Sequence, residues 1–212
     1  MRKFFWLIFA LVLISFLGTF FVLLISFARE AKPENVKVTN ITDQSLTLSW
    51  TTAKPTLGFV RFSGKKVFDD HLRVSTVHHV TLKNLKPQTS YYYRLGGGFR
   101  LFKFDKEGKS LPNIKTAPVL EKISQPRPAY GKVLTSEGKP AARVIVYLSP
   151  SSSSLISTLT NDQGNYSFDL SSLGTTPEPF LLEVEGGTLG KVKGPVFGDR
   201  LQPIKVFVLE KP

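Results

Sequence analysis

The segment LTLSW, residues 46–50, decides the fold class because apolar and polar residues alternate along it without a break. Successive side chains of a β-strand point to opposite faces, so Leu46, Leu48 and Trp50 share one face and are expected to be buried. Short alternating runs of this kind, separated by Gly, Pro, Asn and Asp, recur through residues 31–212. The region shows no sustained helical period, and the pattern predicts an all-β fold made of sandwiches.

Closely spaced prolines divide this β-region into two parts. Three of them lie within the stretch TAPVLEKISQPRPAYG, residues 116–131. Proline cannot donate to a strand ladder, so prolines at this spacing predict a short, fairly stiff linker instead of a central strand. We therefore expect two tandem β-sandwiches, one in residues 31–118 and one in residues 128–212, joined by a linker at 119–127.

The string LKPQTSYYYRL, residues 85–95, has the layout of a tyrosine corner, in which the Tyr91 hydroxyl bonds back to nearby backbone. With this string, the first unit resembles a fibronectin type III domain over residues 33–118. The resemblance is carried by PENV (33–36), SLTLSWTT (45–52) with Trp50, the corner residues Leu85, Pro87, Thr89 and Tyr91, and IKTAP (114–118). It implies a β-sandwich.

The subtype is similar to the domain at the N-terminus of purple acid phosphatases, where a His-Val-Thr-Leu strand leads into the same corner. Here that strand ends at residues 79–82. The resemblance does not imply phosphatase activity, because those enzymes carry their two-metal centre in a separate, larger domain. No stretch of the 212 residues is long enough to be that domain.

The second unit contains a different succession of strands and turns. Its strings are GKV (131–133), GKP (138–140), VIVYL (144–148) and TNDQGNYSFDL (160–170). Tyr166, Phe168 and Leu170 alternate and are expected to point inward, after a tight turn at Gly164 that favours positive φ. Further strands are expected at residues 180–185 and 204–209.

This order of motifs resembles the carboxypeptidase regulatory-like domain, a transthyretin-like β-sandwich grouped with carbohydrate-binding-like folds. The residues that carry the resemblance are Gly138, Pro140, Gly164, Tyr166 and Phe168, within a match over residues 128–210. The resemblance implies an accessory module without peptidase chemistry.

The N-terminal segment predicts a membrane anchor. Residues 4–28 contain no charged side chain, and as an α-helix they are about 37 Å long, more than the roughly 30 Å of a bilayer core. Arg2 and Lys3 precede the segment, and the positive-inside rule then keeps the N-terminus in the cytoplasm and exports residues 31–212. We expect residues 1–30 to be an uncleaved, single-pass signal-anchor in the cell membrane. A cleaved signal peptide is the alternative, and it exports the same residues.

The chain carries 28 Lys and Arg against 16 Asp and Glu, a formal net charge of +12, and no cysteine. The absence of cysteine excludes disulfide staples and thiolate metal sites. A basic excess can indicate nucleic-acid binding, but the expected export argues against DNA and RNA as partners. We expect the lipid bilayer to be a partner through residues 4–28. An anionic cell-envelope polymer, a polysaccharide or a surface protein are candidates for the exported part, and a solvated basic surface without a dedicated partner is the alternative.

The residues that could carry chemistry are few. The three histidines are His71, His78 and His79, and the last two are adjacent. Neighbours on a strand point to opposite faces, so we expect surface or edge-strand histidines and no metal site. The sequence has no Gly-x-Ser-x-Gly motif, and the serines at 151–154 predict a flexible loop. Asp69-Asp70 and Asp162 are interpreted as turn residues. We expect neither an enzyme activity nor a cofactor.

Aromatic and basic side chains gather in one further place. Phe99, Arg100, Phe102 and Lys103 follow a run of three glycines that interrupts a strand. Aromatic rings beside basic groups can stack on sugars or bases, so these four residues are the candidate ligand-binding platform. The alternative is that most of these aromatic rings belong to the sandwich core.

Together these features predict a membrane-anchored, extracytoplasmic, non-catalytic protein that acts in adhesion, as a scaffold or in cell-envelope binding. A carbohydrate-binding accessory module is the first alternative, and an acid-phosphatase-related protein that lacks its catalytic domain is the second. The combination of modules is typical of bacterial surface proteins.

Overall fold

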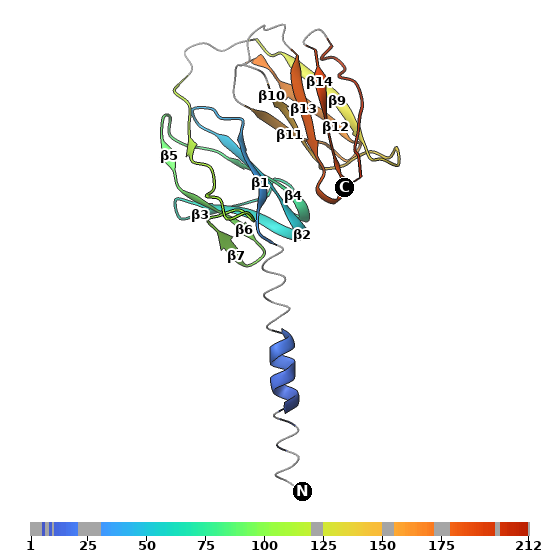
Figure 1. The fold of residues 1–212 in the computed structure, drawn as a ribbon. Coiled ribbons are helices and arrows are strands. Elements are labelled where there is room, and N and C mark those ends of the chain that lie inside the picture. Colours follow the sequence, from blue (N-terminus) through green and yellow to red (C-terminus); the bar gives the residue numbers. More distant parts are fainter. Residues whose placement is uncertain are drawn as a thin grey trace.

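The computed structural model describes residues 6, 9, 11–20, 31–119, 125–149, 155–171, 179–197 and 200–211 (Figure 1). Its strands fall into an N-terminal unit, β1 to β8, and a C-terminal unit, β9 to β15. The elements are β1 (Glu34–Thr39), β2 (Leu46–Phe62), β3 (Lys65–Phe68), β4 (Val74–Leu82), β5 (Ser90–Tyr91), β6 (Tyr93–Gly97), β7 (Arg100–Phe102), β8 (Ile114–Lys115), β9 (Pro128–Leu134), β10 (Ile145–Ser149), β11 (Ile156–Leu159), β12 (Asn165–Asp169), β13 (Phe180–Glu185), the 3-10 turn η2 (Gly187–Leu189), β14 (Lys191–Val196) and β15 (Phe207–Val208).

Residues 11–20 near the N-terminus are helical, and Trp6 and Phe9 have the same conformation. Among the described residues, no helix is both long enough and apolar enough to cross a bilayer. The remaining residues of the expected anchor at 4–28 lie outside the described part of the chain.

Strand β2 organises the N-terminal unit. Its first half pairs with β1, and its second half pairs with β3 and β6. Strand β4 pairs with it from Leu46 to Leu57, with a register shift between Thr51 and Thr56. The exposed residues 53–55 join the two halves, so that the alternating segment 46–50 continues into one strand of 17 residues. One strand therefore contributes to both halves of this sheet.

The predicted inner face of the N-terminal unit forms its core. Trp50 is fully buried and its ring stacks on His78 at a centroid distance of 5.0 Å. The hydroxyl of Tyr91 accepts a hydrogen bond from the backbone N–H of Lys86 at 2.7 Å, which is the bond that a tyrosine corner requires. The buried cluster consists of Leu46, Leu48, Trp50, Val60, Phe62, Val80, Leu82, Leu85, Leu95 and Ile114.

The C-terminal unit contains a sheet of order β11-β10-β13-β14 and a second sheet of order β12-β9-β15. Its inward-facing residues Tyr166 and Phe168 pack edge to face at 5.7 Å and are buried. Gly164 has φ +75°, and a Cβ there would overlap the carbonyl oxygen of Val133, so the turn requires glycine. Strand β14 was not predicted because it contains Gly and Pro195, which an edge strand tolerates.

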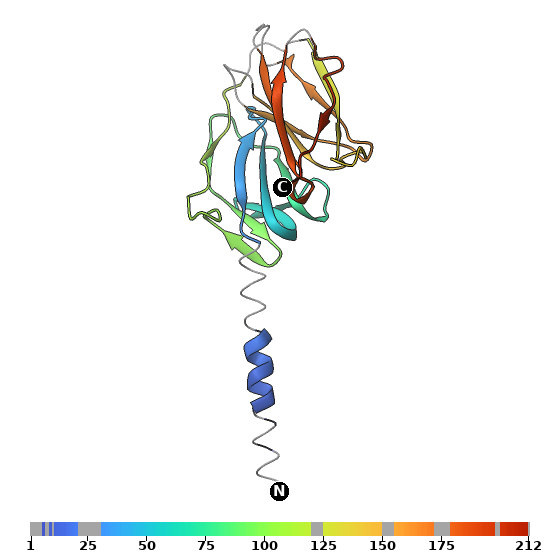
Figure 2. The same cartoon turned by 45° about the vertical axis from the view of Figure 1, so that its right-hand side comes forward.

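The two units lie side by side and are in direct contact (Figures 1 and 2). Val77 of β4 packs with Ile145 and Tyr147 of β10 in a small buried cluster of their own. The faces that meet are the outer faces of the two sheets, since the inner faces form the separate cores of each unit. This contact positions the candidate site.

Candidate functional site

The polar half of the LTLSW alternation faces the C-terminal unit. Thr47 and Ser49 are as buried as the apolar residues between them, although they point away from the core of their own unit. The Ser49 Oγ and the Tyr147 hydroxyl are hydrogen-bonded at 2.9 Å. Lys37 Nζ lies 4.0 Å from the centre of the Tyr147 ring and donates to Glu183 at 2.8 Å. Burial raises the pKa of Tyr147, so its hydroxyl stays protonated.

Asn40 satisfies the free edge of the C-terminal unit's strand β11. Its side chain donates to the carbonyl oxygen of Ser157 and accepts from the N–H of Ser157, both at 2.9 Å. Its backbone N–H donates to the carbonyl oxygen of Leu155 at 3.1 Å. Asn40 therefore takes the place of a neighbouring strand on an edge that would otherwise present unpaired backbone groups.

The same interface holds a carboxylate, an imidazole and a hydroxyl in a row. Asp70 Oδ2 accepts from His79 Nδ1 at 2.9 Å, and His79 Nε2 lies 3.1 Å from the Oγ of Ser157. Burial raises the pKa of the Asp70 carboxyl, but the hydrogen bonds from His79 and Thr81 outweigh burial and hold that pKa below its usual value. This order of groups is that of a Ser-His-Asp triad.

The surroundings of this row favour a structural role over nucleophilic catalysis. Ser157 is only 6% exposed, and its hydroxyl is also 2.6 Å from that of Thr39. Its backbone N–H already donates to Asn40, so it does not offer an oxyanion donor. A nucleophile must reach a substrate carbonyl, whereas Ser157 is enclosed by both units. The row therefore connects the units.

The histidines differ from the expectation in their exposure. His78 is fully buried and His79 is 6% exposed, so neither is a surface residue. Both lie on β4, which pairs only with β2 among the described strands, so the expectation of edge-strand histidines is confirmed. Two consecutive aspartates explain this burial, because Asp69 accepts from His78 at 3.2 Å while Asp70 accepts from His79. Within the described part of the chain, no group of three or more His, Cys, Asp or Glu is arranged to hold a metal ion. His71 is exposed.

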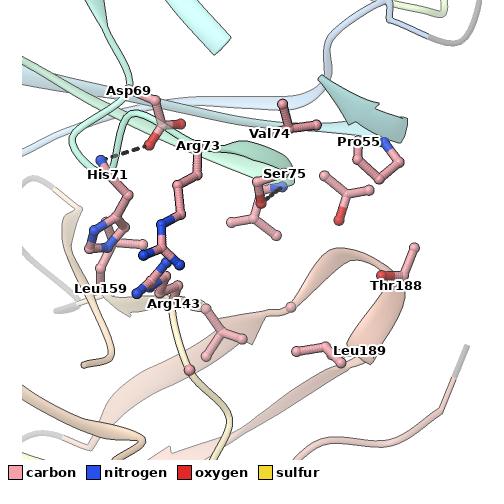
Figure 3. Close-up of a pocket in the computed structure, with 15 residues that line it drawn as sticks. Pro55, Asp69, His71, Arg73, Val74, Ser75, Arg143, Leu159, Thr188 and Leu189 are labelled. Carbon is pink, nitrogen blue, oxygen red and sulfur yellow. Dashed lines mark hydrogen bonds between the residues drawn. The ribbon is translucent and has the colours of Figure 1, made fainter. Parts of the chain in front are cut away.

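A cavity of about 340 Å³ opens beside this interface (Figure 3). Its walls come from the segment before β4, from the residues around Val144 and from η2. Figure 3 shows the side chains of His71, Arg73 and Arg143 at one end, with Leu189 at the other. The sequence interpretation gave no role to this combination, because its residues come from both units.

The predicted aromatic platform lies elsewhere, on the β6–β7 hairpin. Phe99 is fully exposed, Arg100 and Lys103 are exposed, and Phe102 is half-buried. None of these four residues lines the cavity of Figure 3. The residues that carry the two family resemblances differ in exposure. The buried ones are Trp50, Leu85, Gly164, Tyr166 and Phe168, with Gly164 in a turn, Tyr91 is half-buried, and the exposed ones are Pro87, Gly138 and Pro140.

Comparisons with known proteins bear on the N-terminal unit. The family model "Fibronectin type III domain" matches residues 31–97, which confirms that part of the predicted resemblance. No curated protein matches the chain. The purple acid phosphatase subtype and the carboxypeptidase regulatory-like second unit remain predictions.

The solved structures that are similar to the chain include the following two. One is the crystal structure of the FN1–FN3 domains of chicken CNTN1, with 13% identity, a TM-score of 0.29, and coverage of 84% of this chain and 67% of that one. The other is the central fibronectin-III array of RIM-binding protein, with 14% identity and a TM-score of 0.30. That match covers 78% of this chain and 62% of the array, so the chain spans less than two thirds of its length.

Proposed function

We propose that the protein is a membrane-anchored, extracytoplasmic, non-catalytic adhesion or scaffold protein whose two β-sandwich units act as one rigid body. The fibronectin type III match supports this class, because such domains are typical of adhesion and scaffold modules. The observation that carries the proposal is that His79, held by Asp70 of its own unit, contacts Ser157 of the other unit. The groups with the greatest catalytic potential thus serve to hold the units together.

In this arrangement the N-terminal residues anchor the chain in the bilayer, and the N-terminal unit follows. The C-terminal unit, proposed to be transthyretin-like, is held beside it in a fixed orientation. Asn40 accepts a hydrogen bond from the backbone N–H of Ser157 at the edge of strand β11, and His79 contacts the Ser157 hydroxyl. A fixed orientation suits a protein that presents loops to a partner, because less conformational freedom is lost on binding.

The membrane part of the proposal is tested by protease protection. Protease added outside intact cells that express the full chain is expected to digest residues 31–212. Protease that has access only to the cytoplasmic side of the membrane is expected to leave these residues intact. The binding part is tested by passing solubilised cell envelopes over the immobilised full chain in detergent. Retention of an envelope polymer or surface protein is expected, and failure to retain either one contradicts the adhesion role.

The non-catalytic part is tested with esters. The full chain is expected to hydrolyse neither p-nitrophenyl acetate nor p-nitrophenyl phosphate, with or without divalent metal ions. Ester hydrolysis that disappears in Ser157→Ala contradicts the structural role of Ser157. Metal-dependent phosphatase activity contradicts the proposal as a whole.

Carbohydrate binding is the second candidate function, and one observation favours it. An open cavity of about 400 Å³ in the N-terminal unit is lined by Arg61, Tyr92, Tyr93 and Arg94 among others. Tyr92 is almost fully exposed beside these basic groups, a surface on which a sugar ring can stack. Binding to a glycan array that is lost in Tyr92→Ala and kept in Phe99→Ala supports this function.

A further inference from the structure

The cavity of Figure 3 belongs to both units at once. The N-terminal unit contributes Arg73 and Val77, and the C-terminal unit contributes Arg143, Leu159 and Leu189. Its volume of about 340 Å³ is at the lower end of the range of small-molecule sites. Neither unit alone encloses this space, so the site depends on the interface described above.

One end of the cavity carries two guanidinium groups, of which only one is paired with a carboxylate. Arg143 donates to Asp162 through its Nε and an Nη, at 3.1 and 2.8 Å. Arg73 has no ion-pair partner among the described residues. Asp69 also lines the cavity, but its oxygens accept hydrogen bonds from the backbone N–H of His71, from His78 and from the backbone N–H of His79.

The donors at this end favour an oxyanion as ligand. Arg143 is paired with Asp162, Arg73 is not paired with any described residue, and His71 adds two ring nitrogens at the same end (Figure 3). A guanidinium presents a planar fork of donors that matches the two oxygens of a carboxylate or a phosphate. A ligand oxyanion would supply the acceptors that Arg73 lacks.

The remaining walls are apolar. Val77 and Val144 line the cavity and are buried, and Leu159 is half-buried. Val74 and Leu189 are exposed to solvent at the rim although both are aliphatic. An apolar body that covers these side chains removes apolar surface from water, which favours binding by about 25 cal/mol per Å².

We infer that this cavity binds a compact ligand that combines an oxyanion, either carboxylate or phosphate, with an apolar body. Arg73 and Arg143 hold the oxyanion, and Val77, Val144, Leu159 and Leu189 contact the body. This inference goes beyond the adhesion role and does not depend on it, since a protein that retains no envelope component can still bind such a ligand.

The test measures binding of matched probes to the full chain in detergent by titration calorimetry. N-acetyl-L-leucine carries the carboxylate, phenyl phosphate carries the phosphate, and N-acetyl-L-leucinamide is the neutral control of nearly identical shape. At least one anionic probe is expected to bind about tenfold or more tightly than the amide, because hydrogen bonds to charged groups are the strong ones. Which anion binds more tightly identifies the source of the oxyanion.

Variants assign the binding to this cavity. Arg73→Gln is expected to weaken binding of the anionic probe by about tenfold, and Lys83→Gln, at an exposed cation outside the cavity, to leave it unchanged. Asp162→Asn is expected to tighten binding, because it frees the guanidinium of Arg143.

Three results overturn the inference. The first is no binding of either anion at millimolar concentrations, and the second is binding of the neutral amide that is as tight as that of the tighter anionic probe. The third is an unchanged affinity in Arg73→Gln while its urea unfolding midpoint matches the original protein. The adhesion proposal is judged by envelope retention, so the two can fail separately.

Discussion

Replacing Asn40 with glycine is expected to loosen the contact between the two units by about 2–4 kcal/mol. The substitution removes the two 2.9 Å hydrogen bonds to the backbone of Ser157. It leaves the backbone unstrained, because Asn40 has φ +51° and glycine adopts that conformation readily. The backbone bond from residue 40 to Leu155 can still form.

The magnitude follows from what remains after the substitution. A typical hydrogen bond contributes about 0.5–1.5 kcal/mol, and a buried group left unpaired costs about 1–3 kcal/mol. Ser157 is only 6% exposed, so water replaces the lost partner poorly. The loss is a large fraction of the roughly 5–15 kcal/mol that stabilises a folded protein.

Two measurements on the full chain in detergent check this. Urea unfolding gives the change in the free energy of unfolding, and amide hydrogen exchange reports on the N–H of Ser157 directly. A loss of about 2 kcal/mol corresponds to roughly thirtyfold faster exchange where exchange follows opening.

The matched control is Asn84→Gly. Asn84 has φ +59° and is exposed, so it undergoes the same backbone change without an interface contact. If Asn40→Gly and Asn84→Gly have equal unfolding free energies and equal exchange at Ser157, the side chain of Asn40 does not hold the units together and the reasoning fails.

Three further substitutions probe the same region by urea unfolding. Tyr147→Phe removes the hydroxyl that is bonded to the buried Ser49 and is expected to lower the free energy of unfolding by about 1–2 kcal/mol. Tyr92→Phe, at an exposed ring, is the control and is expected to leave it unchanged, so equal effects of the two substitutions refute this. Gly58→Ala places a Cβ on the ring of His78 and is expected to cost about 1–3 kcal/mol, so an unchanged midpoint contradicts the packing. The pKa of the Asp70 carboxyl lies below its usual 3.8, so its contribution to the free energy of unfolding is present above that pH and is lost as pH falls through the lower folded-state pKa. Asp70→Asn is expected to remove this part of the pH dependence of the unfolding free energy. An identical pH dependence in the variant and the original protein counts against the His79 contact.

The inner face of the N-terminal unit was predictable from local sequence. Leu46, Leu48 and Trp50 alternate with polar residues, and all three are buried in the core as expected. Tyr91 makes the predicted corner bond because the required string lies within seven residues. These features depend on neighbours in the chain, which a sequence pattern records.

The outer face was not predictable, because its partner lies far away in the sequence. Thr47 and Ser49 have the composition of a solvated face, yet Ser49 is bonded to Tyr147, 98 residues later. Nothing in the sequence near Asn40 indicates that it pairs with Ser157. A polar alternation specifies which side of a strand a residue occupies and leaves open what covers that side.

The burial of the histidines left a signal that the sequence interpretation did not use. Asp69-Asp70 and His78-His79 are two consecutive pairs with the same spacing of nine residues. Equal spacing lets the two aspartates follow the two imidazoles to opposite faces of β4. The equal spacing of the two aspartates and the two histidines therefore favours buried Asp-His pairs over the interpretation of Asp69-Asp70 as isolated turn residues.

The burial of both faces of the β1–β2–β4 sheet limits how the N-terminal unit can be exchanged between proteins. A domain that presents a fully solvated surface can be moved into another chain as an independent piece. Here a transplanted N-terminal unit would expose the apolar side chain of Val77 to water. The imidazole of His79 would also lose its hydrogen-bond partner Ser157. Protein engineering that moves the N-terminal unit into another chain must therefore transfer both units together, or first redesign the residues of the interface between them.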